Sequence, residues 1–78
     1  MAYQLKIMQK GLDSRGNVVA LCRGAGFSFG EDMSLYSVWY RKGSYCSHAP
    51  GGIAYRWVYI QRSMELEAAQ MLFSKRVV

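Results

Sequence analysis

Three side chains in this sequence could ligate a soft metal or act as nucleophiles: Cys22, Cys46 and His48. Cys22 lies in a predicted strand, whereas Cys46 and His48 lie two residues apart in a predicted loop. A structural zinc site normally takes four ligands in closely spaced pairs, and the sequence contains no such pairs. A Cys–His nucleophile pair usually joins distant parts of a chain and needs a third orienting group. We therefore predict no metal, no cofactor and no catalytic residue, with Cys22 a buried, inert thiol and Cys46 in an exposed loop.

The acidic residues and the glycine-rich segment offer no catalytic arrangement either. Glu31 and Asp32 are adjacent, so they point in opposite directions on an extended chain. Segment 24–30, GAGFSFG, follows a predicted strand, but its third glycine comes one position too late for a dinucleotide-binding loop. We interpret it as a glycine hinge loop whose Phe27 and Phe29 either enter the core or anchor a partner. An enzyme is thus the least favoured class of function.

Length and composition favour a single small domain over residues 1–78. Hydrophobic residues make up 51% of the chain and aromatic residues 14%, which is more than a core of this size hides easily. Tyr and Trp tolerate partial exposure and are enriched at interfaces, so part of the surface is expected to be covered by a partner. The N-terminus has no apolar leader segment, and the longest apolar run, 18–22, is too short to span a bilayer. We therefore expect a cytoplasmic protein, with no membrane partner and reduced thiols.

The net charge of +5 is placed unevenly along the chain. Residues 1–62 carry eight of the ten basic groups and three of the five acidic groups, so the whole excess lies there. A positive field of this kind favours nucleic acid, an anionic surface or an acidic protein, although a charge of this size also serves solubility alone.

The hydrophobic pattern predicts four strands and then one helix. Tyr3, Leu5 and Ile7 alternate with polar residues, and further strands are expected at 18–23, 35–41 and 53–61. Turn residues fill 11–17, and Pro50-Gly51 suits the centre of a type II turn. Segment 64–76 has a wide apolar sector and Ser63 as its expected N-cap. This order predicts an α+β fold, a small four-stranded, mainly antiparallel sheet with one C-terminal helix packed on one face (β-β-β-β-α).

The fourth strand is apolar on both of its faces, which is unusual for a strand with one solvated side. We place its aromatic residues, Tyr55, Trp57 and Tyr59, toward the helix together with Val38. The opposite face is then the open one, and the residues expected on it are Trp39, Arg41, Arg56, Val58, Ile60 and Arg62. A slip of one residue would invert this assignment.

Cations beside aromatic rings are the strongest functional signal in the sequence, as in Trp39-Tyr40-Arg41-Lys42 and 55–57, YRW. Our leading hypothesis is a non-enzymatic protein-binding module that docks a basic and aromatic sheet face on an acidic partner surface. The residues predicted to bind the partner are Trp39, Arg41, Lys42, Arg56, Val58, Ile60 and Arg62, with Phe27 and Phe29 as loop anchors. The alternative is direct nucleic-acid binding through the same face, where rings stack on bases and cations meet phosphates. A homodimer that pairs its open faces is a third alternative.

In size and element order the chain resembles the small single-domain proteins that phages encode to block host defence systems, including anti-CRISPR proteins. The resemblance implies steric occlusion of a nucleic-acid-binding machine by a non-enzymatic inhibitor. Many such inhibitors are acidic mimics of DNA, and a chain with a net charge of +5 cannot act in that way.

Overall fold

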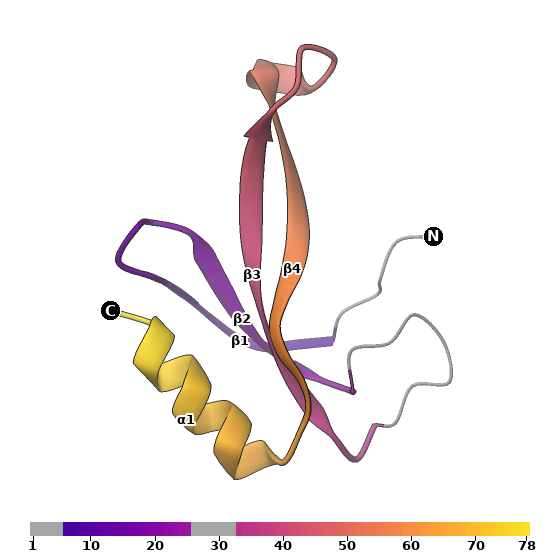
Figure 1. Ribbon diagram of the computed structural model, residues 1–78, viewed down its shortest axis with the longest axis vertical. Helices are drawn as coiled ribbons and strands as arrows, with labels where there is room; N and C mark the ends of the chain where they lie inside the picture. The colour runs from indigo at the N-terminus through magenta and orange to yellow at the C-terminus, as the bar shows by residue number, and fades with distance from the viewer. Residues whose placement is uncertain (1–5, 26–32) are drawn as a thin grey trace.

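The computed structural model describes residues 6–25 and 33–78 as four strands, a short 3-10 turn and a helix (Figure 1). The elements are β1 (Lys6–Leu12), β2 (Val18–Arg23), β3 (Tyr36–Tyr45), β4 (Ile53–Met64) and α1 (Leu66–Arg76). Neighbouring strands pair antiparallel, in the order β1-β2-β3-β4. The predicted α+β fold, an antiparallel four-stranded sheet with a C-terminal helix, is confirmed.

The turn between β1 and β2 is held together by the carboxylate of Asp13. Its Oδ1 accepts hydrogen bonds from the backbone N–H groups of Asn17, at 2.8 Å, and Arg15, at 2.9 Å. Gly16 has a φ of 82°, a left-handed conformation that glycine adopts without steric cost. The donated hydrogen bonds, that from Asn17 above all, favour the charged carboxylate and lower the pKa of Asp13.

The connection between β3 and β4 contains the predicted type II turn. The N–H of Gly52 donates to the carbonyl oxygen of Ala49 at 3.0 Å, and Pro50 and Gly51 lie between them. Gly51 has φ 71° and ψ 5°, the values of the third residue of a type II turn, where glycine is preferred. This tight closure allows β3 and β4 to run side by side as a long hairpin.

Helix α1 covers one face of the sheet. Its Ala69 and Phe73 are buried against a cluster from the three strands β2, β3 and β4, namely Val19, Leu21, Val38 and Met64. The chain end then returns to β1, because the N–H of Val78 donates to the carbonyl oxygen of Leu12 at 3.0 Å. The adjacent Gly11 has no room for a side chain, since a Cβ there would lie 2.6 Å from Cγ1 of Val77.

The helix begins later than the sequence pattern indicates. Strand β4 continues to Met64, α1 starts at Leu66, and Glu65 rather than Ser63 precedes it. Ser63 has a φ of 55° and donates its N–H to the carbonyl oxygen of Ala25 at 3.0 Å. The prediction of a helix from residue 64 with Ser63 as its N-cap was therefore wrong, because pairing with a distant segment and burial of Met64 outweigh local capping.

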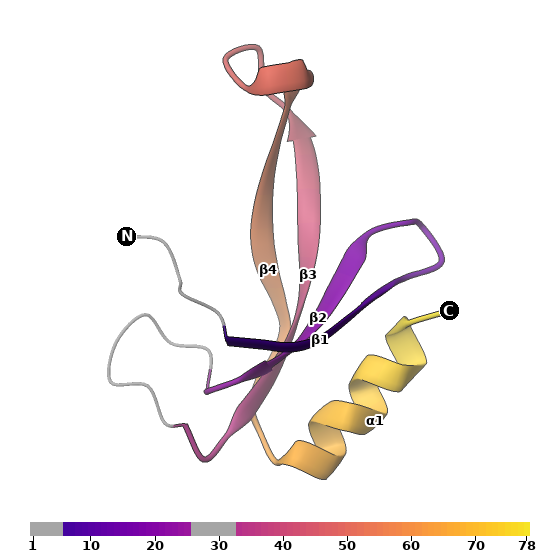
Figure 2. The same cartoon turned by 180° about the vertical axis from the view of Figure 1, so that it is seen from behind.

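The β3–β4 hairpin extends well beyond the rest of the sheet (Figures 1 and 2). Strand β2 pairs with β3 only as far as Tyr40, and from Arg41 onward β4 is the one strand within residues 6–25 and 33–78 that pairs with β3. We call residues 41–57 the arm. It points along the longest dimension of the molecule, which measures 39 × 31 × 15 Å (Figure 1).

Candidate functional site

The sheet face opposite α1, here called the open face, carries its own small core. Ala20, Cys22 and Trp39 are buried there, and Ile7 and Trp57 pack against them. Trp39 is 1% exposed, and its indole N–H donates to the hydroxyl of Ser37 at 2.8 Å. Trp39 thus lies on the expected face but is too deeply buried to serve as an exposed anchor, which corrects its predicted role.

The two faces of β4 are the reverse of the predicted assignment. Tyr59 lies opposite Trp39 and Trp57 lies opposite Arg41, so the aromatic residues of β4 belong to the open face. Val58 lies opposite Tyr40, and Ile60 packs against the cluster beneath α1. Val58 and Ile60 are therefore not residues of the open face.

Two bulges explain why the register could not be read from alternation alone. The pairing of β3 with β4 shifts between Tyr36 and Val38 and again between Val38 and Trp39. Each shift moves the pairing register by one residue. Beyond it, the side chains of β4 share a face with different side chains of β3 than simple alternation predicts. A strand that is apolar on both sides gives no signal of such a shift.

The open face of β4 presents tyrosines paired with arginines. The guanidinium carbon of Arg41 lies 4.6 Å from the ring centroid of Tyr55, and that of Arg62 lies 4.0 Å from the ring centroid of Tyr59. The Tyr59 ring meets Trp39 edge-on, with centroids 5.8 Å apart and an interplanar angle of 80°. Because a cation lies over each of these two rings, this face is both aromatic and positively charged.

Two cations lie directly opposite each other on the other side of the arm. Lys42 pairs with Arg56 across the β3–β4 ladder, and both side chains are exposed. Arg56 therefore does not share the open face, contrary to the expectation, and neither does Lys42. The hairpin offers them no counter-ion of its own, because the sequence has no Asp or Glu between Asp32 and Glu65.

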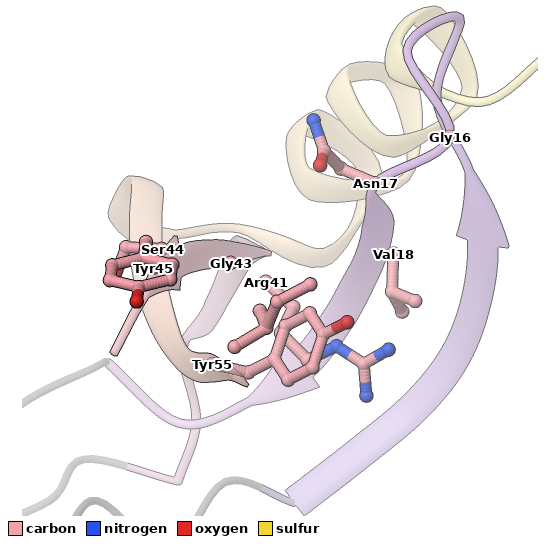
Figure 3. A pocket seen from close by; sticks show the side chains of 9 residues that line it. Gly16, Asn17, Val18, Arg41, Gly43, Ser44, Tyr45 and Tyr55 are labelled. Carbon is pink, nitrogen blue, oxygen red and sulfur yellow. The ribbon is translucent and has the colours of Figure 1, made fainter. Parts of the chain in front are cut away.

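A pocket of about 560 Å³ lies between the side of the arm, from Arg41 to Tyr45, and the β1–β2 turn (Figure 3). Tyr45, Ile53 and Tyr55 supply its apolar lining from β3 and β4, and Arg41 lines it as well. Asn17 borders it from the turn (Figure 3). The predicted site does not include Tyr45, Ile53, Tyr55 or Asn17. One signal was present in the sequence, because residues at every second position, such as Arg41, Gly43 and Tyr45, lie on one face of a strand.

The three residues that could ligate a soft metal lie in two separate parts of the fold. Cys22 is buried in β2, where desolvation raises the pKa of its thiol to about 12. Cys46 is half-buried and His48 exposed, and both lie in the connection at the end of the arm. Within residues 6–25 and 33–78, no three His, Cys, Asp or Glu side chains form a group that could hold a metal ion. Phe27 and Phe29, the predicted loop anchors, lie outside the described residues.

No family model matches the chain, and neither the curated proteins nor the solved structures contain a significant match to it. The resemblance to phage-encoded inhibitors therefore stays a prediction. In the described part of the chain, α1 is the one α-helix, and it is too short and too polar to cross a membrane.

Proposed function

We propose that this protein is a non-enzymatic module that binds nucleic acid through the β3–β4 hairpin. The observation that carries the proposal is the arm itself, a two-stranded projection with cations on both sides and no carboxylate. Arg41 lies on the open face, and Lys42 and Arg56 lie on the other. A two-stranded ribbon is narrow enough to enter a nucleic-acid groove, and phosphates supply the charge that the hairpin lacks.

The like-charge pair on the arm supports an anionic ligand. Like charges directly opposite each other in a sheet destabilise the pairing, and Lys42 and Arg56 hold such positions. Violations of a local stability rule concentrate at functional sites, where a ligand removes the conflict. A phosphate group near both side chains would turn this repulsion into two favourable contacts.

The composition of the open face favours nucleic acid over our original leading hypothesis, an acidic protein surface. That hypothesis depends on an apolar outer face of β4 that includes Val58 and Ile60, but both residues lie on the helix side of the strand. The open face instead presents Tyr55 and Tyr59, which are 59% and 47% exposed and stacked with arginines. Rings and guanidinium planes of this kind stack on bases. A cytoplasmic location is part of the proposal.

Binding of a fluorescein-labelled oligothymidine, followed by fluorescence anisotropy over a salt series, tests the proposal. Three phosphate contacts from Arg41, Lys42 and Arg56 predict a slope of about −2 in log affinity against log salt. The affinity should then fall roughly 20-fold between about 50 and about 200 mM salt. Replacing Lys42 by Ala should reduce the slope by about 0.7, whereas the exposed Lys75 of α1, replaced by Ala, is the matched control and should leave it unchanged.

Two outcomes would overturn the proposal. One is an oligonucleotide affinity that does not depend on salt. The other is a polyglutamate peptide of equal charge that binds while the oligonucleotide does not, which would support the acidic protein partner instead. A solution mass that doubles as the protein concentration rises, with no binding of either probe, would support the homodimer instead.

A further inference from the structure

The pocket between the side of the arm and the β1–β2 turn has the chemistry of a site for a flat, polar group that is joined to an anion. Its aromatic wall comes from two diagonal neighbours on the open face, Tyr45 of β3 and Tyr55 of β4. Tyr45 is 85% exposed, so its ring is available to a ligand. Ile53, directly opposite Tyr45 in the ladder, adds an apolar contact beside the rings.

Gly43 explains why the Tyr55 ring lies flat against the arm. Gly43 is the ladder partner of Tyr55, and a Cβ at this position would lie 2.9 Å from Cε1 of the tyrosine. The ring thus occupies the space that a side chain at residue 43 would fill, as aromatic residues do opposite glycine in sheets. The Arg41 guanidinium, 4.6 Å from the ring centroid, places a positive charge at the same wall.

The polar side of the pocket is fixed by the β1–β2 turn. Asn17 is held by Asp13, which accepts hydrogen bonds from its backbone N–H at 2.8 Å and its side-chain Nδ2 at 3.4 Å. Because the amide nitrogen is directed to Asp13, the amide oxygen is left to accept a hydrogen bond from a ligand. Figure 3 shows Asn17 across the pocket from Tyr45 and Tyr55.

From this arrangement we propose that the pocket takes one unpaired base of a single-stranded nucleic acid. The base stacks on the tyrosine wall, its N–H edge donates to Asn17, and the adjoining phosphate meets Arg41. A base inside a duplex is stacked and paired, so it cannot enter such a pocket without being extruded. This inference rests on the proposed function and narrows its ligand from nucleic acid in general to a single strand.

The test compares two labelled probes, an oligothymidine of about 12 nucleotides and a duplex of the same length, with three proteins. Tyr45→Leu removes the most exposed ring, and Tyr45→Phe keeps the ring and is the matched control. We expect Tyr45→Leu to weaken single-strand binding about 5- to 150-fold, the range that stacking of one base supports, and Tyr45→Phe to bind like the wild type. The wild type should also prefer the single strand to the duplex.

The outcomes separate this inference from the proposed function. Single-strand binding that is unchanged in Tyr45→Leu, or a duplex that binds as tightly as the single strand, would refute the base pocket and leave nucleic-acid binding intact. Failure of both probes to bind the wild type would remove the proposed function itself. Since Tyr45 is exposed on the arm, its replacement is not expected to unfold the protein, and the circular dichroism spectrum of each variant checks this.

Discussion

Replacing Arg56 by glutamate should stabilise the arm while weakening nucleic-acid binding. Arg56 and Lys42 are exposed ladder partners, so the substitution turns a repulsive pair into an attractive one. Cross-strand charge pairs change stability by about 0.2–1 kcal/mol each, and exposure to solvent screens them. We therefore expect Arg56→Glu to stabilise the closed arm by about 0.5–1 kcal/mol at low salt, which is a factor of about 2–5 in its opening equilibrium.

Amide hydrogen exchange of the arm is the suitable measurement, because the arm can open before the whole sheet unfolds. A two-stranded hairpin alone is marginally stable in water, and beyond Tyr40 no third strand of the described part of the chain pairs with the arm. The exchange of the amides that donate hydrogen bonds between the two strands of the arm, such as that of Cys46 to the carbonyl oxygen of Gly52, should slow about 2- to 5-fold in Arg56→Glu at low salt. At about 1 M salt, where the Debye length is about 3 Å, the difference should nearly vanish.

The charge-reversed double variant is the control for this prediction. Lys42→Glu combined with Arg56→Glu restores a like-charge pair, now negative, so its exchange rates should return to those of the wild type. Each single variant should instead slow exchange by a similar factor. Arm exchange in Arg56→Glu that is equal to or faster than that of the wild type at low salt would show that the pair is not a source of strain, and would remove one support for an anionic ligand.

Four further predictions concern the core, the two thiols and the β1–β2 turn. Phe73→Ala should cost about 3–5 kcal/mol and leave the protein largely unfolded by circular dichroism, whereas the exposed Met71→Ala should change stability by less than about 0.5 kcal/mol. In the native protein a thiol reagent should modify Cys46 much faster than the buried Cys22, and equal rates would contradict the described core. Because the pKa of Cys22 is raised to about 12 from 9.0, its thiol ionises more readily in the unfolded chain, so unfolding experiments should show stability falling as pH rises from about 9 toward 12. The pKa of Asp13 is lowered in the folded protein, so its carboxylate stabilises the fold at neutral pH, and this stabilisation is lost as pH falls below about 3.8. The urea midpoint of unfolding should therefore fall less steeply with acid in Asp13→Ala than in the wild type.

The strands, in their sequence positions, and most turns followed from local patterns that the structure retains, whereas the strand order β1-β2-β3-β4 did not follow from the sequence. Segment 18–23 is β2 itself, since a compact β-branched run between turn residues has few alternatives. The type II turn at Pro50-Gly51 followed from the backbone preferences of those two residues. Strands β3 and β4 both extend further toward their C-terminal ends than predicted, because long-range pairing continues them through 42–45 and through 62–64, where local propensity is weak.

The features that could not be predicted depend on contacts between distant segments. The face assignment of β4 failed because two bulges in its pairing with β3 have no signature in a strand that is apolar on both sides. The burial of Trp39 depends on Ile7 and Trp57, which come from strands at opposite edges of the sheet. The pocket likewise joins Asn17 of one hairpin to Tyr45 of another, so no single segment of sequence shows it.

The separation of the arm from the helix-covered sheet has a consequence for how such a protein can change over evolutionary time. Phe73, Leu21 and Val38 hold the sheet and helix together, and none of them belongs to the arm. Substitutions at the exposed positions of 41–56 can therefore change the surface of the arm with little effect on the fold. Trp57, which packs against the buried Trp39, and the sheet itself tolerate little change. The charge and ring content of the arm can thus change while the sheet and helix are kept, and we expect that an arm of a different sequence could be grafted onto this sheet.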